Sequence, residues 1–278
     1  MCSGCRKPEP IARVFDLWSF PGNPGFLHSK VSPEYVRIMT SPAHDNPAAE
    51  SPAADATAVR DATERLLAAV DALDDAAVRA PSHLPGWTRG HVLAHLARNA
   101  DALINVLSGR PMYVSGESRD ADIERDAPHT AAEHLEDLRA SAARLDAAFA
   151  DEAGESWQRT VELRNGVTDL AASVPFRRWI EVELHHVDLG VGYAIDDLPA
   201  GFVDRETANM ARRFDGHPDL TEAVELRAED GRSWRTGART GEPVVVVGTP
   251  AALTGWLTGR TTGSGLSASA PLPSLPPL

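Results

Sequence analysis

Two segments of the chain carry histidine and carboxylate side chains at spacings that could bind one metal ion. His95 lies in GWTRGHVLAHL, and Glu181 and His185 lie in RRWIEVELHHVDLG. If the second segment is helical, Glu181 and His185 share one face, with their Cβ atoms about 6 Å apart. Two imidazoles and one carboxylate leave a coordination position open, which is typical of catalytic rather than structural zinc. The pattern predicts a metal-dependent enzyme whose substrate or cofactor binds the metal directly.

Spacing alone leaves other histidines open as ligands. His91 and His95 are also four residues apart and could form a two-histidine pair. His186 follows His185 but projects about 100° away around a helix, so both do not easily face one metal. Asp188, three residues after His185, could accept a hydrogen bond from its imidazole N–H and so orient the ring.

A simpler interpretation is that these histidines are buried core residues that hydrogen-bond to their neighbours. Glu181 argues against it, because a buried carboxylate is costly without a partner and a metal ion is a suitable one. Glu183 is two residues further along and should face away from the side of the helix that carries Glu181.

Four amphipathic segments are expected to position these residues in a helical bundle spanning residues 56–198. Thr88 is predicted to cap one helix, and Thr130 with Glu133 forms a capping box at the start of another. Asn165-Gly166 between two β-like runs predicts a hairpin. The predicted helices are 56–78, 89–107, one that begins at 130, and 172–191.

The pattern changes after Pro199, and residues 199–263 are predicted to form a small α/β domain. GFVDRETANMARRF and AALTGWLTGR are expected to be helices, EPVVVVGTP is expected to be a buried strand, and Asp230-Gly231 predicts a hairpin. The fold class is therefore α+β. Residues 1–55 and 264–278 are rich in proline without periodicity, so both are predicted to be disordered.

Composition excludes several classes of function. The net charge of −13 argues against binding to nucleic acid or to anionic membranes. No apolar run of about 18 residues is present, and the N-terminus lacks a secretory pattern, so a cytoplasmic location is expected. Cys2 and Cys5 form a CxxC pair with no matching second pair, and no cysteine follows them. Thiol chemistry in the folded body would need a thiol from another molecule.

Three segments resemble the mycothiol-dependent maleylpyruvate isomerase family, within the DinB-like metal-binding four-helix bundles. They are HLPGWTRGHVLAHLARNADAL, RPMYVSGESRDADIE and HHVDLGVGYAIDDLP. The resemblance implies that the metal ligands are His95, Glu181 and His185, rather than His91 or His186. It also implies a sterol-carrier-like C-terminal domain that supplies an arginine needed for activity. The matching segment is GWLTGR, so Arg260 is the expected catalytic residue.

The resemblance further implies two cofactors, mycothiol and zinc or another divalent metal. A metal-bound thiol is deprotonated, and the thiolate would add to the double bond of maleylpyruvate. Rotation about the resulting single C–C bond, followed by loss of the thiolate, would give fumarylpyruvate. Because this substrate is a dianion, cations must recruit it; Arg260, Arg178 and Arg89 are candidates.

Two other functions remain open at this point. A mycothiol S-transferase acting on other electrophiles would use the same metal and thiol with a different acceptor pocket. A non-catalytic binding bundle would keep the metal for structure alone.

Overall fold

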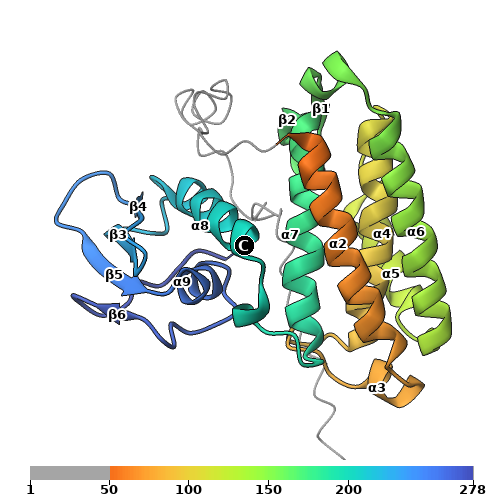
Figure 1. Cartoon of the computed structure of the whole chain (residues 1–278), viewed down its shortest axis with the longest axis horizontal. Helices are drawn as coiled ribbons and strands as arrows, with labels where there is room; N and C mark the ends of the chain where they lie inside the picture. The colour runs from red at the N-terminus through yellow and green to blue at the C-terminus, as the bar shows by residue number, and fades with distance from the viewer. Residues whose placement is uncertain (1–50, 278) are drawn as a thin grey trace, which may run out of the picture.

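The structure is a computed structural model and describes residues 51–277. Most of the predicted N-terminal extension, with Cys2 and Cys5, lies outside the described residues. Within residues 51–277, a helical bundle is followed by a smaller domain that contains a sheet (Figure 1). The α+β prediction is confirmed.

Four long helices form the bundle. Helix α2 packs between α6 and α7, and α4 also contacts both α6 and α7, so the four helices enclose one core. The leucines that fill this core include Leu66, Leu93, Leu96, Leu145 and Leu184, each at most 1% exposed. The helices are α2 (Pro52–Asp71), α4 (Arg89–Leu107), α6 (Ala131–Asp151) and α7 (Val174–Leu189).

The ends of the helices follow from their capping residues. The Thr88 side chain accepts from the backbone N–H of His91 at the start of α4, and Thr130 with Glu133 forms the predicted capping box of α6. Helix α7 ends at Gly190, which has a φ of 62°. A Cβ at this glycine would lie 2.6 Å from the His83 ring, so the close approach also requires glycine.

The first predicted helix, 56–78, is two helices in the structure. Helix α2 begins at Pro52 because Ser51 caps it and proline fits the first turn. It ends at Asp71, and the side chain of Asp74 then caps the short helix α3 (Asp75–Arg79). The turn between them redirects the chain toward α4.

Helix α5 (Gly116–Asp126) was not predicted and packs against α4. Its buried positions are Arg119, Ile123 and Asp126, which have helical spacing. Two of the three are charged, so hydrophobic periodicity does not reveal the helix.

A two-stranded hairpin connects α6 to α7, as predicted from Asn165-Gly166. Strands β1 (Thr160–Glu162) and β2 (Thr168–Leu170) pair antiparallel, and Asn165 has a φ of 60° in the turn. Three short 3₁₀ helices flank or join the strands: η1 (Gly154–Gln158), η2 (Arg164–Gly166) and η3 (Ala171–Ser173).

The C-terminal domain packs two helices with a four-stranded sheet. The strand order is β4-β3-β5-β6, in which β3 and β5 are parallel and the outer pairs are antiparallel. Helix α8 contacts α9 and β4, and α9 contacts β3 and β5. The elements are η4 (Ile195–Asp197), α8 (Ala200–Phe214), β3 (Ala223–Ala228), β4 (Ser233–Gly237), β5 (Val244–Gly248), α9 (Pro250–Leu257) and β6 (Ser267–Ala268).

The prediction that residues 264–278 are disordered was wrong for the described part of this tail. Strand β6 (Ser267–Ala268) pairs with β5, and Leu272 and Leu275 pack against the core. The proline-rich sequence has few backbone N–H groups to donate and therefore forms little regular structure. Burial of the two leucines holds it in place nonetheless.

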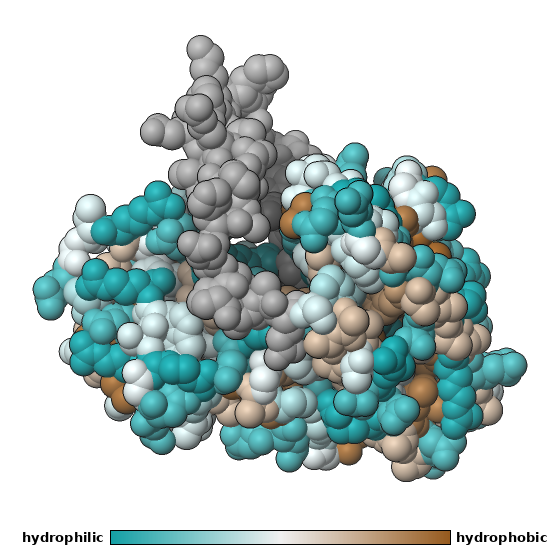
Figure 2. All heavy atoms as spheres, turned by 45° about the horizontal axis from the view of Figure 1, so that its top comes forward, coloured by the Kyte–Doolittle hydropathy of each residue, from teal (hydrophilic) through white to brown (hydrophobic). Residues whose placement is uncertain are grey.

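Polar residues cover most of the face shown in Figure 2, and apolar residues are scattered among them. Among the described residues, no helix combines the length and the apolar character needed to cross a bilayer.

Candidate metal centre

The structure brings His95, Glu181 and His185 together in the interior of the bundle. Helix α4 supplies His95, and the adjacent helix α7 supplies the other two. Each of the three residues is at most 2% exposed. One potential ligand atom from each lies within 4.8 Å of the others. These are the three residues predicted from the sequence as metal ligands.

The two imidazoles approach the same carboxylate oxygen. His95 Nε2 lies 3.0 Å from Glu181 Oε2, and His185 Nε2 lies 3.2 Å from it. The two rings stand edge to face, with centroids 4.8 Å apart. The other oxygen of Glu181, Oε1, is buried and has no hydrogen-bond partner within the described residues. Two imidazole nitrogens and one carboxylate, with one of its oxygens buried and unpartnered, fit the donor set of a divalent metal such as zinc.

The protonation states of His95 and Glu181 are compatible with metal ligation. Burial lowers the pKa of His95 to about 4 despite its contact with Glu181, so this imidazole is neutral at pH 7. Burial alone would raise the pKa of Glu181, but its contacts with both histidines hold it well below its ordinary value. A neutral imidazole and an ionised carboxylate are the forms that bind metals.

Asp188 fixes the orientation of His185. His185 Nδ1 donates to Asp188 Oδ2 at 2.8 Å, which leaves Nε2 to face Glu181. Burial would lower the pKa of His185, but the contacts with Asp188 and Glu181 outweigh burial and raise it. This carboxylate–histidine pair orients metal-binding histidines in many proteins, and it matches the role expected for Asp188.

Arg260 approaches the trio from the C-terminal domain. Its Nε and NH2 atoms donate to the two oxygens of Asp188, at 3.2 and 2.8 Å. Its NH1 atom donates to the backbone oxygen of Thr258. Burial would raise the pKa of Asp188, but the charge of Arg260 and the His185 hydrogen bond lower it to about 2. Arg260 therefore reaches the candidate centre through Asp188 and His185.

The alternative histidines lie outside the trio. His91 Nδ1 contacts the hydroxyl of Thr88 at 2.7 Å, within the capping box of α4. The His186 ring stacks on Tyr193, with centroids 4.0 Å apart. Glu183 faces away from Glu181, as predicted.

Glu183 is the centre of a second buried network. Its carboxylate accepts hydrogen bonds from Arg65, Trp179 and Tyr193. A complete set of protein donors satisfies this carboxylate without a metal. Glu181 differs from Glu183 in this respect, which is why only the first marks a candidate metal centre.

All three arginines expected to recruit the substrate bind protein groups in this structure, Arg260 through Asp188 and Thr258. Arg178 NH1 donates to Leu96 O and to Asn99 Oδ1 inside the bundle. Arg89 donates to backbone oxygens of Ala77, Leu189 and Gly190, where it joins the ends of helices. Both therefore have structural roles in this conformation.

Arg119 and Tyr113 lie beside the trio but were not predicted as site residues. Arg119, on α5, places NH2 3.3 Å from His95 Nδ1 and is 4% exposed. Its guanidinium also lies 5.9 Å from the centroid of the Tyr113 ring. Burial raises the pKa of Tyr113 to about 12, so its hydroxyl stays protonated. Both residues lie within the segment RPMYVSGESRDADIE, but nothing in their spacing points to the trio.

Comparison with known proteins gives two matching family models. The model described as the mycothiol maleylpyruvate isomerase N-terminal domain matches residues 59–190, and the one described as the MDMPI C-terminal domain matches residues 197–277. The bundle and the small domain thus match consecutive parts of one protein. Comparison with curated proteins gives no match.

Two similar solved structures cover both domains. A crystal structure of the mycothiol-dependent maleylpyruvate isomerase has 28% sequence identity and a TM-score of 0.74. It covers 81% of this chain and 97% of that chain. A mutant of that enzyme, with one histidine replaced by alanine, has 27% identity, the same coverage and the same TM-score.

Proposed function

Because the chain belongs to the mycothiol maleylpyruvate isomerase family, we propose that it converts maleylpyruvate to fumarylpyruvate with mycothiol and a divalent metal. The observation that carries this proposal is the buried trio of His95, Glu181 and His185. Within residues 51–277 the site comprises three ligand atoms, and three protein ligands with an open position are the arrangement of metal sites that act on a bound molecule.

His95 Nε2, a carboxylate oxygen of Glu181 and His185 Nε2 would hold the metal, and zinc suits this donor set best. When bound, such a metal supplies Lewis acidity, which keeps a coordinated thiol deprotonated near neutral pH. The rigid helices α4 and α7 fix the three ligands before any molecule binds, because all three are buried in the bundle core.

The residues around the trio have distinct tasks. Asp188 keeps the proton of His185 on Nδ1, so that Nε2 presents its lone pair. Arg260 holds Asp188 ionised and in place. Arg119 places a buried positive charge beside His95, where it can stabilise an anionic substrate or thiolate. The buried apolar side chains of the bundle exclude water from this environment.

The implied partners are a small dicarboxylate substrate and a low-molecular-weight thiol. We further propose that the enzyme acts in the cytoplasm, because a free thiol cofactor stays reduced in that compartment. A mycothiol S-transferase would use the same trio with another electrophile.

An acceptor screen separates these two activities. Purified, metal-loaded protein is incubated with mycothiol and either maleylpyruvate or a generic electrophile. We expect fumarylpyruvate to form without net consumption of thiol. Rapid conjugation of the generic electrophile, with maleylpyruvate left unchanged, would instead assign the chain as an S-transferase.

A further inference from the structure

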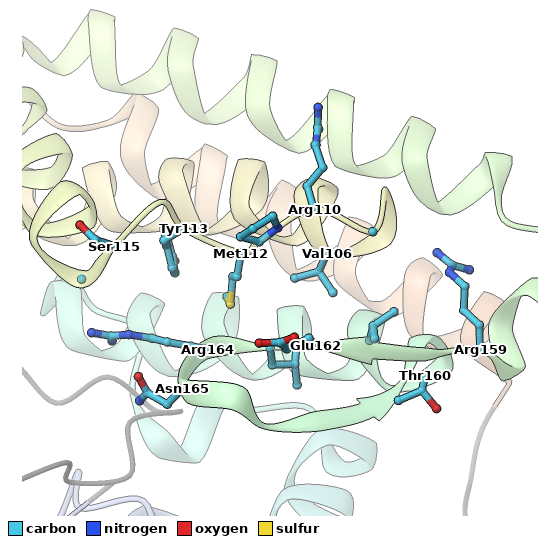
Figure 3. A pocket seen from close by; sticks show the side chains of 15 residues that line it. Val106, Arg110, Met112, Tyr113, Ser115, Arg159, Thr160, Glu162, Arg164 and Asn165 are labelled. Carbon is cyan, nitrogen blue, oxygen red and sulfur yellow. The ribbon is translucent and has the colours of Figure 1, made fainter.

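A cavity of about 590 Å³ lies between the segment that joins α4 to α5 and the β1–β2 hairpin (Figure 3). Met112 and Tyr113 line it from the first segment, and Glu162, Arg164 and Asn165 line it from the hairpin. In Figure 3, Met112 points toward the hairpin, and Arg164 extends from the hairpin toward Ser115. Two elements distant in the sequence therefore build one cavity.

The cavity lies close to the metal trio on two sides. Met112 and Arg164 also line a second, narrow cavity that includes Glu181 in its wall. On the other side, Tyr113 lies beside Arg119, whose guanidinium contacts His95. Only a few side chains, among them Met112, Arg164 and Arg119, therefore separate the large cavity from the trio.

The walls of the cavity suit a polyhydroxylated ligand. Glu162 offers acceptor oxygens, Arg110 offers donors, and the Asn165 amide offers both. Tyr113 and Met112 add flat or flexible apolar surface, against which the C–H face of a sugar ring can pack. Apolar surface with a few polar groups is typical of small-molecule sites, whose volumes are about 300–1,000 Å³.

The dianionic substrate fits this cavity less well. Its size is far below 590 Å³, so it would leave most of the cavity unfilled. Arg159, which also lines the cavity, already pairs with Glu152 and donates to the backbone oxygen of Leu107. Arg110 and Arg164 line the wall as well, so the mismatch with the substrate lies in size rather than in charge.

We propose that this cavity binds the sugar portion of the thiol cofactor, so that the thiol itself reaches the trio. The proposal rests on the proposed function and adds to it the surface that selects the cofactor. Glu162 and Arg110 would recognise the sugar, and neither would take part in the reaction.

The test compares two thiols in Glu162→Ala and Arg110→Ala. For mycothiol, removing one recognition group should raise KM about tenfold with little change in kcat. For N-acetylcysteine, which lacks the sugar, KM should change less than about twofold because the lost contact was never made. The matched control is Glu136→Ala, since Glu136 is exposed on α6 and does not line the cavity. Metal content should equal that of the wild type in every variant.

A binding measurement without turnover gives a second readout. Calorimetry with the sugar portion alone, lacking the cysteine, should show binding to the wild type and weaker binding to Glu162→Ala. Equal KM changes for both thiols, or equal binding of the sugar portion to both proteins, would overturn the proposal. Failure of the proposed function is distinguishable, because the wild type would then show no isomerisation with either thiol.

Discussion

Arg260 in the C-terminal domain forms a two-point ion pair with Asp188 on α7, and Asp188 in turn holds the ring of His185. The contacts from Arg260 to Asp188 and from Asp188 to His185 join the second domain to the candidate metal centre. The family resemblance implies that this arginine is needed for activity. The contact gives a physical reason: loss of Arg260 would leave a buried carboxylate without its counter-ion beside a candidate metal ligand.

We predict that Arg260→Ala lowers kcat/KM about ten- to a hundred-fold, or about 1.5–3 kcal/mol, because it removes a charge-assisted contact. Asp188→Asn should have a similar effect, and the double variant should be little worse than either single one. Steady-state kinetics on the three variants measures this coupling. The matched control is the exposed Arg239–Asp215 pair in the same domain, whose variants should leave kcat/KM unchanged. Fully additive losses from Arg260 and Asp188 would contradict the coupling.

If His95 rather than His91 binds the metal, His95→Ala and His91→Ala should differ in metal content. Purified wild-type protein should carry about one divalent metal per chain. His95→Ala should lose most of it, because a site with two remaining ligands binds weakly. His91→Ala should retain it, since His91 serves the capping box of α4. Elemental analysis decides the matter, and full metal retention in His95→Ala would rule out this ligand.

The orientation of His185 and His186 on helix α7 gives a second prediction about metal content. His185→Ala should lose the metal, whereas His186→Ala should keep it, because the His186 ring stacks on Tyr193 away from the trio. Loss of metal from His186→Ala with retention in His185→Ala would mean that the opposite face of α7 carries the site. Circular dichroism on both variants serves as the folding control.

Because Glu206 on α8 is buried, we predict that it makes the free energy of unfolding depend on pH. Burial raises its pKa to about 7 from an ordinary value of 4.5. The unfolded chain therefore releases this proton first, and Glu206 destabilises the fold progressively as pH rises from about 4.5 to 7. Glu206→Gln should raise the free energy of unfolding by about 2–3 kcal/mol at pH 8 but only by about 1 kcal/mol at pH 5.

Urea unfolding at the two pH values checks this prediction. Glu229→Gln is the matched control, because Glu229 is exposed, and it should have little effect at either pH. A gain in stability for Glu206→Gln that is equal at pH 5 and pH 8 would show that ionisation of Glu206 is not its cause.

The sequence predicts the main helices well because periodicity and capping are local, whereas the choice of His95 over His91 and of His185 over His186 comes from the family resemblance. The four-residue interval between Glu181 and His185 sets one face of α7, and capping residues such as Thr88 and Thr130 mark where helices begin. The hairpin at Asn165-Gly166 is equally local, since the turn requires a residue tolerant of positive φ.

What the sequence could not predict depends on contacts between distant segments. Arg119 lies near His95 only because α5 packs on α4, and two of the three buried residues of α5 are charged. The pairing of Arg260 with Asp188 spans two domains, which no periodicity records. The tail was misassigned because Leu272 and Leu275 are held by tertiary burial rather than by regular backbone structure.

The most direct test of the whole account is the initial rate of maleylpyruvate isomerisation, measured with and without mycothiol and with and without bound metal. We predict that fumarylpyruvate forms only when both are present, and that restoring zinc to chelated protein restores the rate. Isomerisation that proceeds equally well in metal-depleted protein, or without any thiol, would contradict the account.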